Sequence, residues 1–111
     1  THIIISEWTR LQIGDGFELR ELDTIAVKWK TEWIKIYELI GYKSDKIDRT
    51  LYDTYEQGLA LYRATNYMEA GKIWWDLAEI DPVSRVMTTR CVEIIKWNIA
   101  VENGIYHMTH K

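Results

Sequence analysis

Residues 20–39, RELDTIAVKWKTEWIKIYEL, decide the fold of the N-terminal half of this 111-residue chain. A strand is predicted over residues 17–27, and β-branched and aromatic side chains at 34–37 mark a second strand. The connection between them, 28–32, is short and polar. Two neighbouring strands with such a link are typical of a β-hairpin, and we expect one here.

The residues before the hairpin predict a further strand and a short helix. Residues 3–5 are a run of isoleucines, which favours a buried strand. Ser6 is a good N-cap, Glu7 falls in the first turn of the helix that follows, and we expect that helix to run through Leu11. The Gly-Asp-Gly sequence at 14–16 then ends it.

The remainder of the chain has the pattern of helices. A linker is expected at 41–46, and apolar residues then recur at helical spacing in two segments. Their predicted inner faces are Leu51, Tyr55, Gly58, Leu59 and Tyr62 in the first, and Tyr67, Ala70, Trp74, Leu77 and Ala78 in the second. Asp81 is placed to cap a third helix that has Pro82 at its first position. The Asn-Gly pair at 103–104 predicts a turn, and 105–111 an extended tail.

Composition sets the broad class of protein. Hydrophobic residues make up 47% and charged residues 28%, as in ordinary globular domains, and a net charge of −3 gives no reason to expect binding to nucleic acid or to an anionic membrane. No apolar run has the roughly 18 residues that a membrane span needs, and no signal peptide opens the chain. Cys91 is the single cysteine, which excludes an internal disulfide and a multi-cysteine zinc site. We therefore expect a cytoplasmic setting, with Cys91 as a buried structural thiol rather than a reactive one.

The hairpin sequence resembles the closing hairpin of class III adenylate/guanylate cyclase catalytic domains, whose usual form is RELDxxxVKGKxEPVxxYEL. The segment before it, HIIISEWTR at 2–10, is similar to the strand and helix that precede this hairpin in bacterial cyclases. The resemblance implies that Lys28, at the first lysine of the family's VKGK turn, contacts the triphosphate of the nucleotide, a role that suits a compact ammonium charge. Trp29 stands where the family has glycine, and Trp33 where it has proline. The alternative is that Lys28 is a solvated turn residue.

The same resemblance implies that this chain is inactive by itself. Class III cyclases use two aspartates to hold two divalent metals, with an asparagine and an arginine that stabilise the transition state, and all of these lie N-terminal to the part that this sequence matches. Asp15 falls in a turn and Asp23 in a strand, so two-metal catalysis cannot be assembled from them. We expect no catalytic residue, metal ligand or cofactor in this chain, with Mg²⁺ or Mn²⁺ bound only by the complete parent enzyme.

The helical half resembles a tetratricopeptide repeat. The repeat's spacing of small, aromatic and proline residues is found at Gly58, Tyr67, Ala70, Trp74 and Pro82. Small residues at 58 and 70 let two antiparallel helices approach, and Trp74 fills the space between helix pairs. One such unit cannot bury its apolar face alone, so we expect it to stack on the third helix, on the preceding part or on a second subunit.

A more specific resemblance is to the C-terminal extension of certain bacterial cyclases. It is carried by LALYR at 59–63, YMEA at 67–70, DPVSRV at 81–86, RC at 90–91 and NGIYHMT at 103–109. Together the two cyclase resemblances cover nearly the whole chain. The predicted fold is therefore α+β: a strand, short helix and β-hairpin at 1–40, a linker at 41–46, and three antiparallel, tetratricopeptide-like helices with an extended tail at 47–111.

Three tryptophans are candidate interaction residues. Trp75 adjoins Trp74, so it points away from the predicted core and offers a contact surface; Trp29 and Trp33 belong to the same prediction. The expected partner is the remainder of the cyclase catalytic domain or a second subunit. A homo-oligomer is expected, because a hairpin outside its full sheet exposes strand edges.

The predicted function is that of a non-catalytic, structural/regulatory or dimer-docking piece of a cyclase that makes cAMP or cGMP from ATP or GTP. One alternative is a free-standing interaction module that binds a peptide or partner protein through its helices. Another is an engineered chain without native function, with which six tryptophans and one proline would agree.

Other candidate sites are weaker. His107 and His110 are three residues apart and would suit a metal if helical, but without a third ligand they are better interpreted as part of a polar tail. Two carboxylate pairs fit a solvated helix face better than acid–base chemistry: Asp45 with Asp48, and Glu69 with Asp76.

Overall fold

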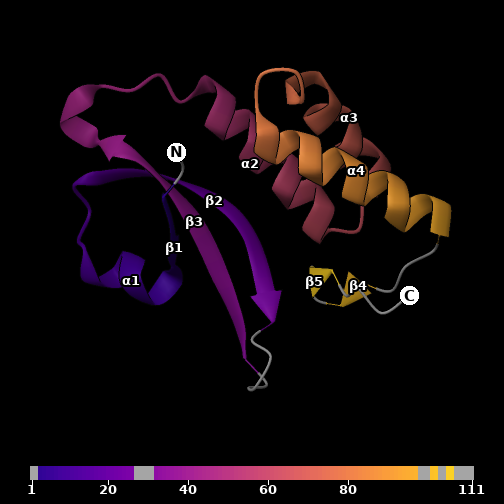
Figure 1. Cartoon of the computed structure of the whole chain (residues 1–111), viewed down its shortest axis with the longest axis horizontal. Helices are drawn as coiled ribbons and strands as arrows, with labels where there is room; N and C mark the ends of the chain where they lie inside the picture. The colour runs from indigo at the N-terminus through magenta and orange to yellow at the C-terminus, as the bar shows by residue number, and fades with distance from the viewer. Residues whose placement is uncertain (1–2, 27–31, 98–100, 103–104, 107–111) are drawn as a thin grey trace. The chain divides into compact units, whose positions relative to one another are not determined.

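The computed structural model of the chain (Figure 1) describes residues 3–26, 32–97, 101–102 and 105–106. The chain divides into two compact units, Thr1–Tyr52 and Asp53–Lys111. The described residues contain a three-stranded antiparallel sheet and four α-helices. The prediction of a mixed α and β fold is confirmed at this level, whereas the domain boundaries at 40 and 46 stay a prediction.

The first unit is built around its central strand. Its elements are β1 (Ile3–Ser6), α1 (Glu7–Gln12), β2 (Phe17–Ala26), β3 (Trp33–Tyr42) and the short 3₁₀ helix η1 (Lys43–Asp45). The strands lie in the order β1-β3-β2, and both outer strands run antiparallel to β3. The strand predicted at residues 3–5 is present, but the prediction that it is buried is wrong for Ile3 and Ile4, which are more than half exposed on an outer strand. β2 and β3 pair along their length, from Ala26 with Trp33 to Phe17 with Tyr42. They form a hairpin whose connection, 27–31, lies outside the described residues.

A β-bulge explains why the hydrophobic alternation of β2 is imperfect. Glu21 pairs with Tyr37 and Asp23 with Ile36, which leaves Leu22 as an extra residue on β2. Because a bulge opposes two residues to one on the partner strand, the adjacent Leu22 and Asp23 are both buried. The side chains of β2 therefore do not follow a single period of two.

β3 extends further than the sequence predicts. A linker is expected from Gly41, but the strand continues to Tyr42 and η1 follows it. A Cβ on Gly41 would lie 2.9 Å from Ile47 Cδ1 and 3.2 Å from Asp45 Oδ2. Glycine is needed here because the chain packs closely on the strand, rather than because the strand ends.

α1 has the cap that the sequence predicts. The Ser6 hydroxyl oxygen accepts a hydrogen bond from the Thr9 backbone N–H at 3.2 Å. After the helix, Gly14 has a φ of 78°, a conformation that glycine adopts without strain. A capping side chain at one end and a glycine just beyond the other define this short helix.

The second unit contains the helical half of the chain. Its elements are α2 (Thr50–Arg63), whose first turn belongs to the first unit, α3 (Tyr67–Leu77), α4 (Pro82–Trp97) and the paired two-residue strands β4 (Val101–Glu102) and β5 (Ile105–Tyr106). Asp81 Oδ2 accepts hydrogen bonds from the Ser84 backbone N–H at 3.2 Å and from its hydroxyl at 2.6 Å, so Asp81 caps α4 as predicted. The predicted turn at 103–104 and the residues 107–111 of the predicted tail lie outside the described residues.

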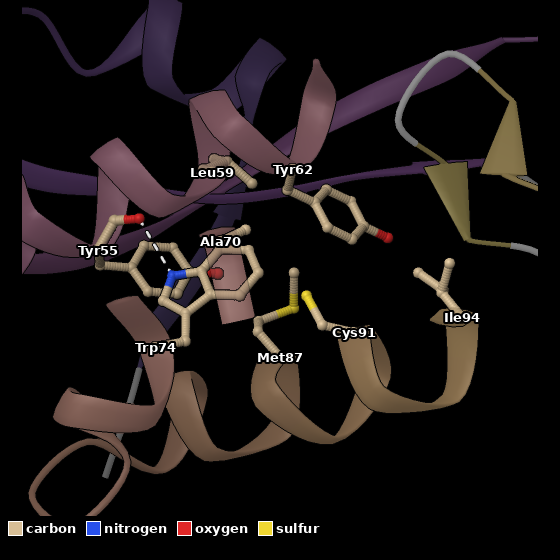
Figure 2. Close-up of a cluster of buried hydrophobic side chains, with 8 residues drawn as sticks. All are labelled: Tyr55, Leu59, Tyr62, Ala70, Trp74, Met87, Cys91 and Ile94. Atoms are coloured by element: carbon tan, nitrogen blue, oxygen red, sulfur yellow. Dashed lines mark hydrogen bonds between the residues drawn. The ribbon is translucent and has the colours of Figure 1, made fainter. Parts of the chain in front are cut away.

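The core of the second unit surrounds Trp74 (Figure 2). Eight buried side chains from α2, α3 and α4 form it: Tyr55, Leu59, Tyr62, Ala70, Trp74, Met87, Cys91 and Ile94. Trp74 is fully buried, and its Nε1 donates a hydrogen bond to the Tyr55 carbonyl oxygen at 3.2 Å. Gly58 faces the indole, and a Cβ on it would lie 2.6 Å from Trp74 Nε1. Gly58 therefore lets α2 and α3 approach, which is the role that the sequence predicts for it.

Candidate functional site

Half of the predicted site residues lie in the described part of the chain. Lys28 and Trp29 lie outside it. Trp33 is the first residue of β3 and is 44% exposed, and Trp75 on α3 is 70% exposed. The two belong to different compact units. Both are accessible on their own unit, and their part in an interaction stays a prediction.

Trp75 lines a groove between α3 and α4. The groove has a volume of about 410 Å³. Its lining residues are Tyr67, Met68, Gly71, Lys72, Trp75 and Asp76 of α3, with Thr88, Cys91, Val92 and Ile95 of α4. In each helix these residues recur three or four positions apart, which places them along one face. This α3–α4 groove is the candidate functional site of the helical unit.

The α3–α4 groove is apolar and open to solvent. Four of its large apolar side chains are about half exposed or more: Met68, Trp75, Val92 and Ile95. Large apolar side chains that gather on one surface mark contact sites in soluble proteins, and tryptophan is enriched in binding hot spots. The arrangement suits the burial of an apolar segment of a partner.

Gly71 of α3 and Cys91 of α4 lie close together in the lining of the groove. A Cβ on Gly71 would lie 3.4 Å from the Cys91 Cβ. Cys91 is 1% exposed, and burial raises the pKa of its thiol to about 11, with Arg90 acting in the opposite direction. The thiol is protonated at neutral pH, whereas nucleophilic and metal-binding cysteines need the thiolate. The prediction that Cys91 is buried is confirmed.

The carboxylates near the start of α2 serve as hydrogen-bond acceptors in the local structure. Asp48 Oδ1 accepts from the Thr50 backbone N–H at 3.0 Å and from its hydroxyl at 2.7 Å, and these bonds lower the pKa of Asp48. Asp45 Oδ2 accepts a hydrogen bond from the backbone N–H of Tyr42, the last residue of β3, at 3.1 Å. On α3, Glu69 lies 3.7 Å from Lys72 Nζ, and both side chains are mostly exposed. The hydrogen bonds of Asp45 and Asp48 give these two carboxylates structural roles.

No described group of three or more His, Cys, Asp and Glu side chains is placed to hold a metal ion. His107 and His110 lie outside the described residues. None of the helices that the structure describes combines the length and the hydropathy of a membrane span.

A buried ion pair in the first unit is a feature that sequence reasoning missed. Arg20 on β2 is 1% exposed, and its Nε donates a hydrogen bond to Glu38 Oε1 of β3 at 3.0 Å. The Arg20 guanidinium also lies over the ring of Tyr52, 5.1 Å from its centre. Both charged residues stand in the quoted hairpin sequence, but their pairing depends on the register of the strands. The bulge in β2 hides that register from a count along the sequence.

Comparison with known proteins bears on the relationships of the chain. A curated protein, "Adenylate cyclase, terminal-differentiation specific" from Dictyostelium discoideum, is 32% identical to it over 105 residues. The match covers 86% of this chain and 5% of that cyclase. No protein-family profile matches the sequence, and no solved structure matches it. The chain is therefore similar to a short part of an adenylate cyclase, which gives weak support for a relationship to that class of enzyme.

Proposed function

We propose that this chain is the C-terminal part of a class III nucleotide cyclase and acts in it as a non-catalytic, structural/regulatory or dimer-docking segment. The observation that carries the proposal is the similarity to an adenylate cyclase over 86% of the chain. The matched 86% of the chain is longer than either compact unit, so the similarity includes residues of both units. This agrees with the cyclase-like motifs that occur in order at 1–40 and 47–111.

The proposed parent is of the bacterial type that the motifs resemble, and it converts ATP or GTP to cAMP or cGMP and pyrophosphate with two Mg²⁺ or Mn²⁺ ions. Lys28, in the connection of the β2–β3 hairpin, is proposed to contact the triphosphate. Asp15 is exposed in the turn after α1, and Asp23 is buried and accepts a hydrogen bond from the Thr24 backbone N–H at 2.8 Å. These positions support a segment whose metal-binding aspartates lie elsewhere in the parent.

The proposed partner is the remainder of the catalytic domain or a second subunit. On the first unit, the large apolar side chains that are more than half exposed include Ile3, Ile4, Trp8 and Leu11. β1 and β2 are the outer strands of the sheet, and outer strands invite pairing. On these grounds we propose that the parent is a homo-oligomer. We also propose that it works in the cytoplasm and that this segment contacts neither nucleic acid nor membrane.

Complementation tests the proposal. The reading frame upstream of Thr1 is expected to encode a segment with the two metal-binding aspartates. Mixed with this chain, that segment should form cyclic nucleotide from ATP or GTP with Mn²⁺, whereas this chain alone should form none. Lys28→Ala should lower the restored turnover about 10-fold or more, the loss of one charge-assisted contact to phosphate. Lys46→Ala, at an exposed lysine, is the matched control and should have no effect.

Three outcomes contradict parts of this proposal. Turnover by this chain alone contradicts the non-catalytic role. An upstream frame without paired aspartates, or a start codon close to Thr1, contradicts the proposal that the chain is a fragment. Equal losses from the two lysine variants contradict the triphosphate contact while leaving the relationship to cyclases in place.

The α3–α4 groove favours a second candidate function, an interaction module that binds a peptide or partner protein. We propose that α2, α3 and α4 pack in the antiparallel, tetratricopeptide-like way. The close approach of Gly58 to Trp74 supports that packing. In this case the chain works without a catalytic partner, and the exposed apolar side chains of the groove are its binding surface.

Trp75→Ala is expected to weaken partner binding about 30-fold or more, because an exposed tryptophan in a groove is a typical hot spot. The free energy of unfolding should change by less than about 0.5 kcal/mol, since the side chain is 70% exposed. Fluorescence anisotropy with labelled peptides measures binding, and urea unfolding measures stability. Trp97→Ala is the control, because Trp97 is 64% exposed on α4 but does not line the groove. Equal effects of the two variants would count against the groove.

A further inference from the structure

Arg49 holds the chain between β3 and α2 against β2. Its Nη1 donates hydrogen bonds to the Leu19 carbonyl oxygen at 2.8 Å and to Glu18 Oε1 at 3.0 Å. The side chains of Arg49 and Glu18 are 26% and 19% exposed, so the ion pair is largely shielded from solvent. Arg49 therefore contacts both the backbone and a side chain of β2.

Tyr52 makes a second connection to the same strand. It lies in the first turn of α2, and the Arg20 guanidinium lies 5.1 Å from the centre of its ring. Arg20 is buried and paired with Glu38, so the cation over the ring is desolvated, the condition in which a cation–π contact is strongest. Residues 49 and 52 thus contact three consecutive residues of β2, 18–20.

The same segment fixes the start of α2 and packs on β3. Asp48 accepts the two hydrogen bonds from Thr50 that begin the helix. Ile47 lies so close to Gly41 of β3 that a Cβ on the glycine would meet its Cδ1 at 2.9 Å. Residues 47–52 are termed the strap. The strap contacts both strands of the hairpin and contains the first turn of α2.

We propose that the strap couples α2 to the β2–β3 hairpin, so that weakening the helix loosens the strands. α2 runs without interruption from Thr50, in the first unit, to Arg63, in the second. Because a helix is cooperative along its length, the residues beyond 52 stabilise the turn that the strap holds on β2. The inference concerns the chain's own equilibria and does not rest on the cyclase proposal. In a cyclase, the coupling would let the helical part act on the hairpin that carries Lys28.

Hydrogen exchange of β2 peptides, read by mass spectrometry, tests the coupling. Gln57→Gly puts a poor helix former at an exposed position of α2, away from the strap, and is expected to speed exchange in β2 about five-fold. Thr89→Gly makes the same kind of change at an exposed position of α4 and should leave β2 unchanged. In the Arg49→Ala background, β2 exchanges faster from the outset and Gln57→Gly adds a smaller change, because the contact of Tyr52 with Arg20 remains.

Three results would overturn the coupling. One is unchanged β2 exchange in Gln57→Gly. Another is equal acceleration by Thr89→Gly, which would show that the whole chain opens as one unit. The third is an effect of Gln57→Gly that is undiminished in the Arg49→Ala background. If Arg49→Ala does not fold, Arg49→Lys replaces it; this variant keeps the charge but loses the planar fork, and should give an intermediate acceleration.

Discussion

The Trp74→Ala variant is expected to lose about 3 to 5 kcal/mol of the free energy of unfolding of the helical unit, the range for removal of a large buried aromatic side chain. Trp74 is fully buried against the rings of Tyr55 and Tyr62, with centroids 5.3 and 5.7 Å away. The variant also loses the hydrogen bond from Nε1 to the Tyr55 carbonyl oxygen. Urea unfolding followed by circular dichroism at 222 nm measures the change. A loss below about 1 kcal/mol would show that Trp74 is not central to this core.

Gly58→Ala is the internal control for that packing, because its effect should change sign with residue 74. With Trp74 present, the added Cβ would lie 2.6 Å from Nε1, and we expect a loss of about 1 to 3 kcal/mol from overpacking. In the Trp74→Ala background the space is open, and alanine should stabilise α2 by up to about 1 kcal/mol through its higher helix propensity. The same sign in both backgrounds would contradict the close contact. The two changes form a double-mutant cycle.

Glu38→Ala is expected to destabilise the sheet unit by about 3 to 5 kcal/mol, the usual cost of removing one partner of a buried ion pair. Glu38 and Arg20 are 6% and 1% exposed, so the variant removes the Glu38 carboxylate from a guanidinium that stays buried. Tyr52 still contacts the guanidinium, but a neutral ring does not replace a carboxylate. Urea unfolding combined with hydrogen exchange in β2 and β3 measures the loss in this unit.

Two further variants separate burial from charge in that result. Lys35→Ala removes the cation of another pair between the same strands, with Glu21 at 3.9 Å, but the lysine side chain is 46% exposed and the cost should be below about 1 kcal/mol. Replacing Arg20 and Glu38 together by leucine should cost less than Glu38→Ala alone, since both charges of the pair are then removed from the interior. Equal effects of Glu38→Ala and Lys35→Ala would contradict the argument from burial.

Features that depend on neighbouring residues were predictable from the sequence. Ser6, Asp81 and Pro82 act within about one helical turn, so their chemistry can be recognised without a tertiary structure. Gly58 and Trp74 were predictable as a pair because a missing side chain and a very large one occur at the spacing of two packed helices. Helix starts and the helical core therefore follow from local patterns.

Features that depend on pairing between strands were not predictable. The partner of Arg20 follows from the register of β2 and β3, and the extra residue at Leu22 changes that register in the middle of the strand. The predicted linker begins at Gly41 because glycine usually marks a break at the end of a strand pattern. Its reason here is the approach of Ile47, six residues later, which no local pattern contains.

The candidate site was only half predictable. The exposure of Trp75 follows from the burial of Trp74, since adjacent residues of a helix point in different directions. The opposite wall of the groove, with Val92 and Ile95, depends on how α4 packs beside α3. Helical spacing in α4 marks a face but does not say which helix that face meets.

The bulge at Leu22 has a consequence for sequence alignment. Up to the bulge the buried residues of β2 have even numbers, Arg20 and Leu22, whereas the next buried residue, Asp23, has an odd one. The numbers of the buried residues thus change from even to odd inside the strand. An ungapped alignment with a relative that lacks the extra residue would assign all later positions of the strand to the opposite face of the sheet. A cysteine-accessibility scan would reveal the switch as two consecutive protected positions.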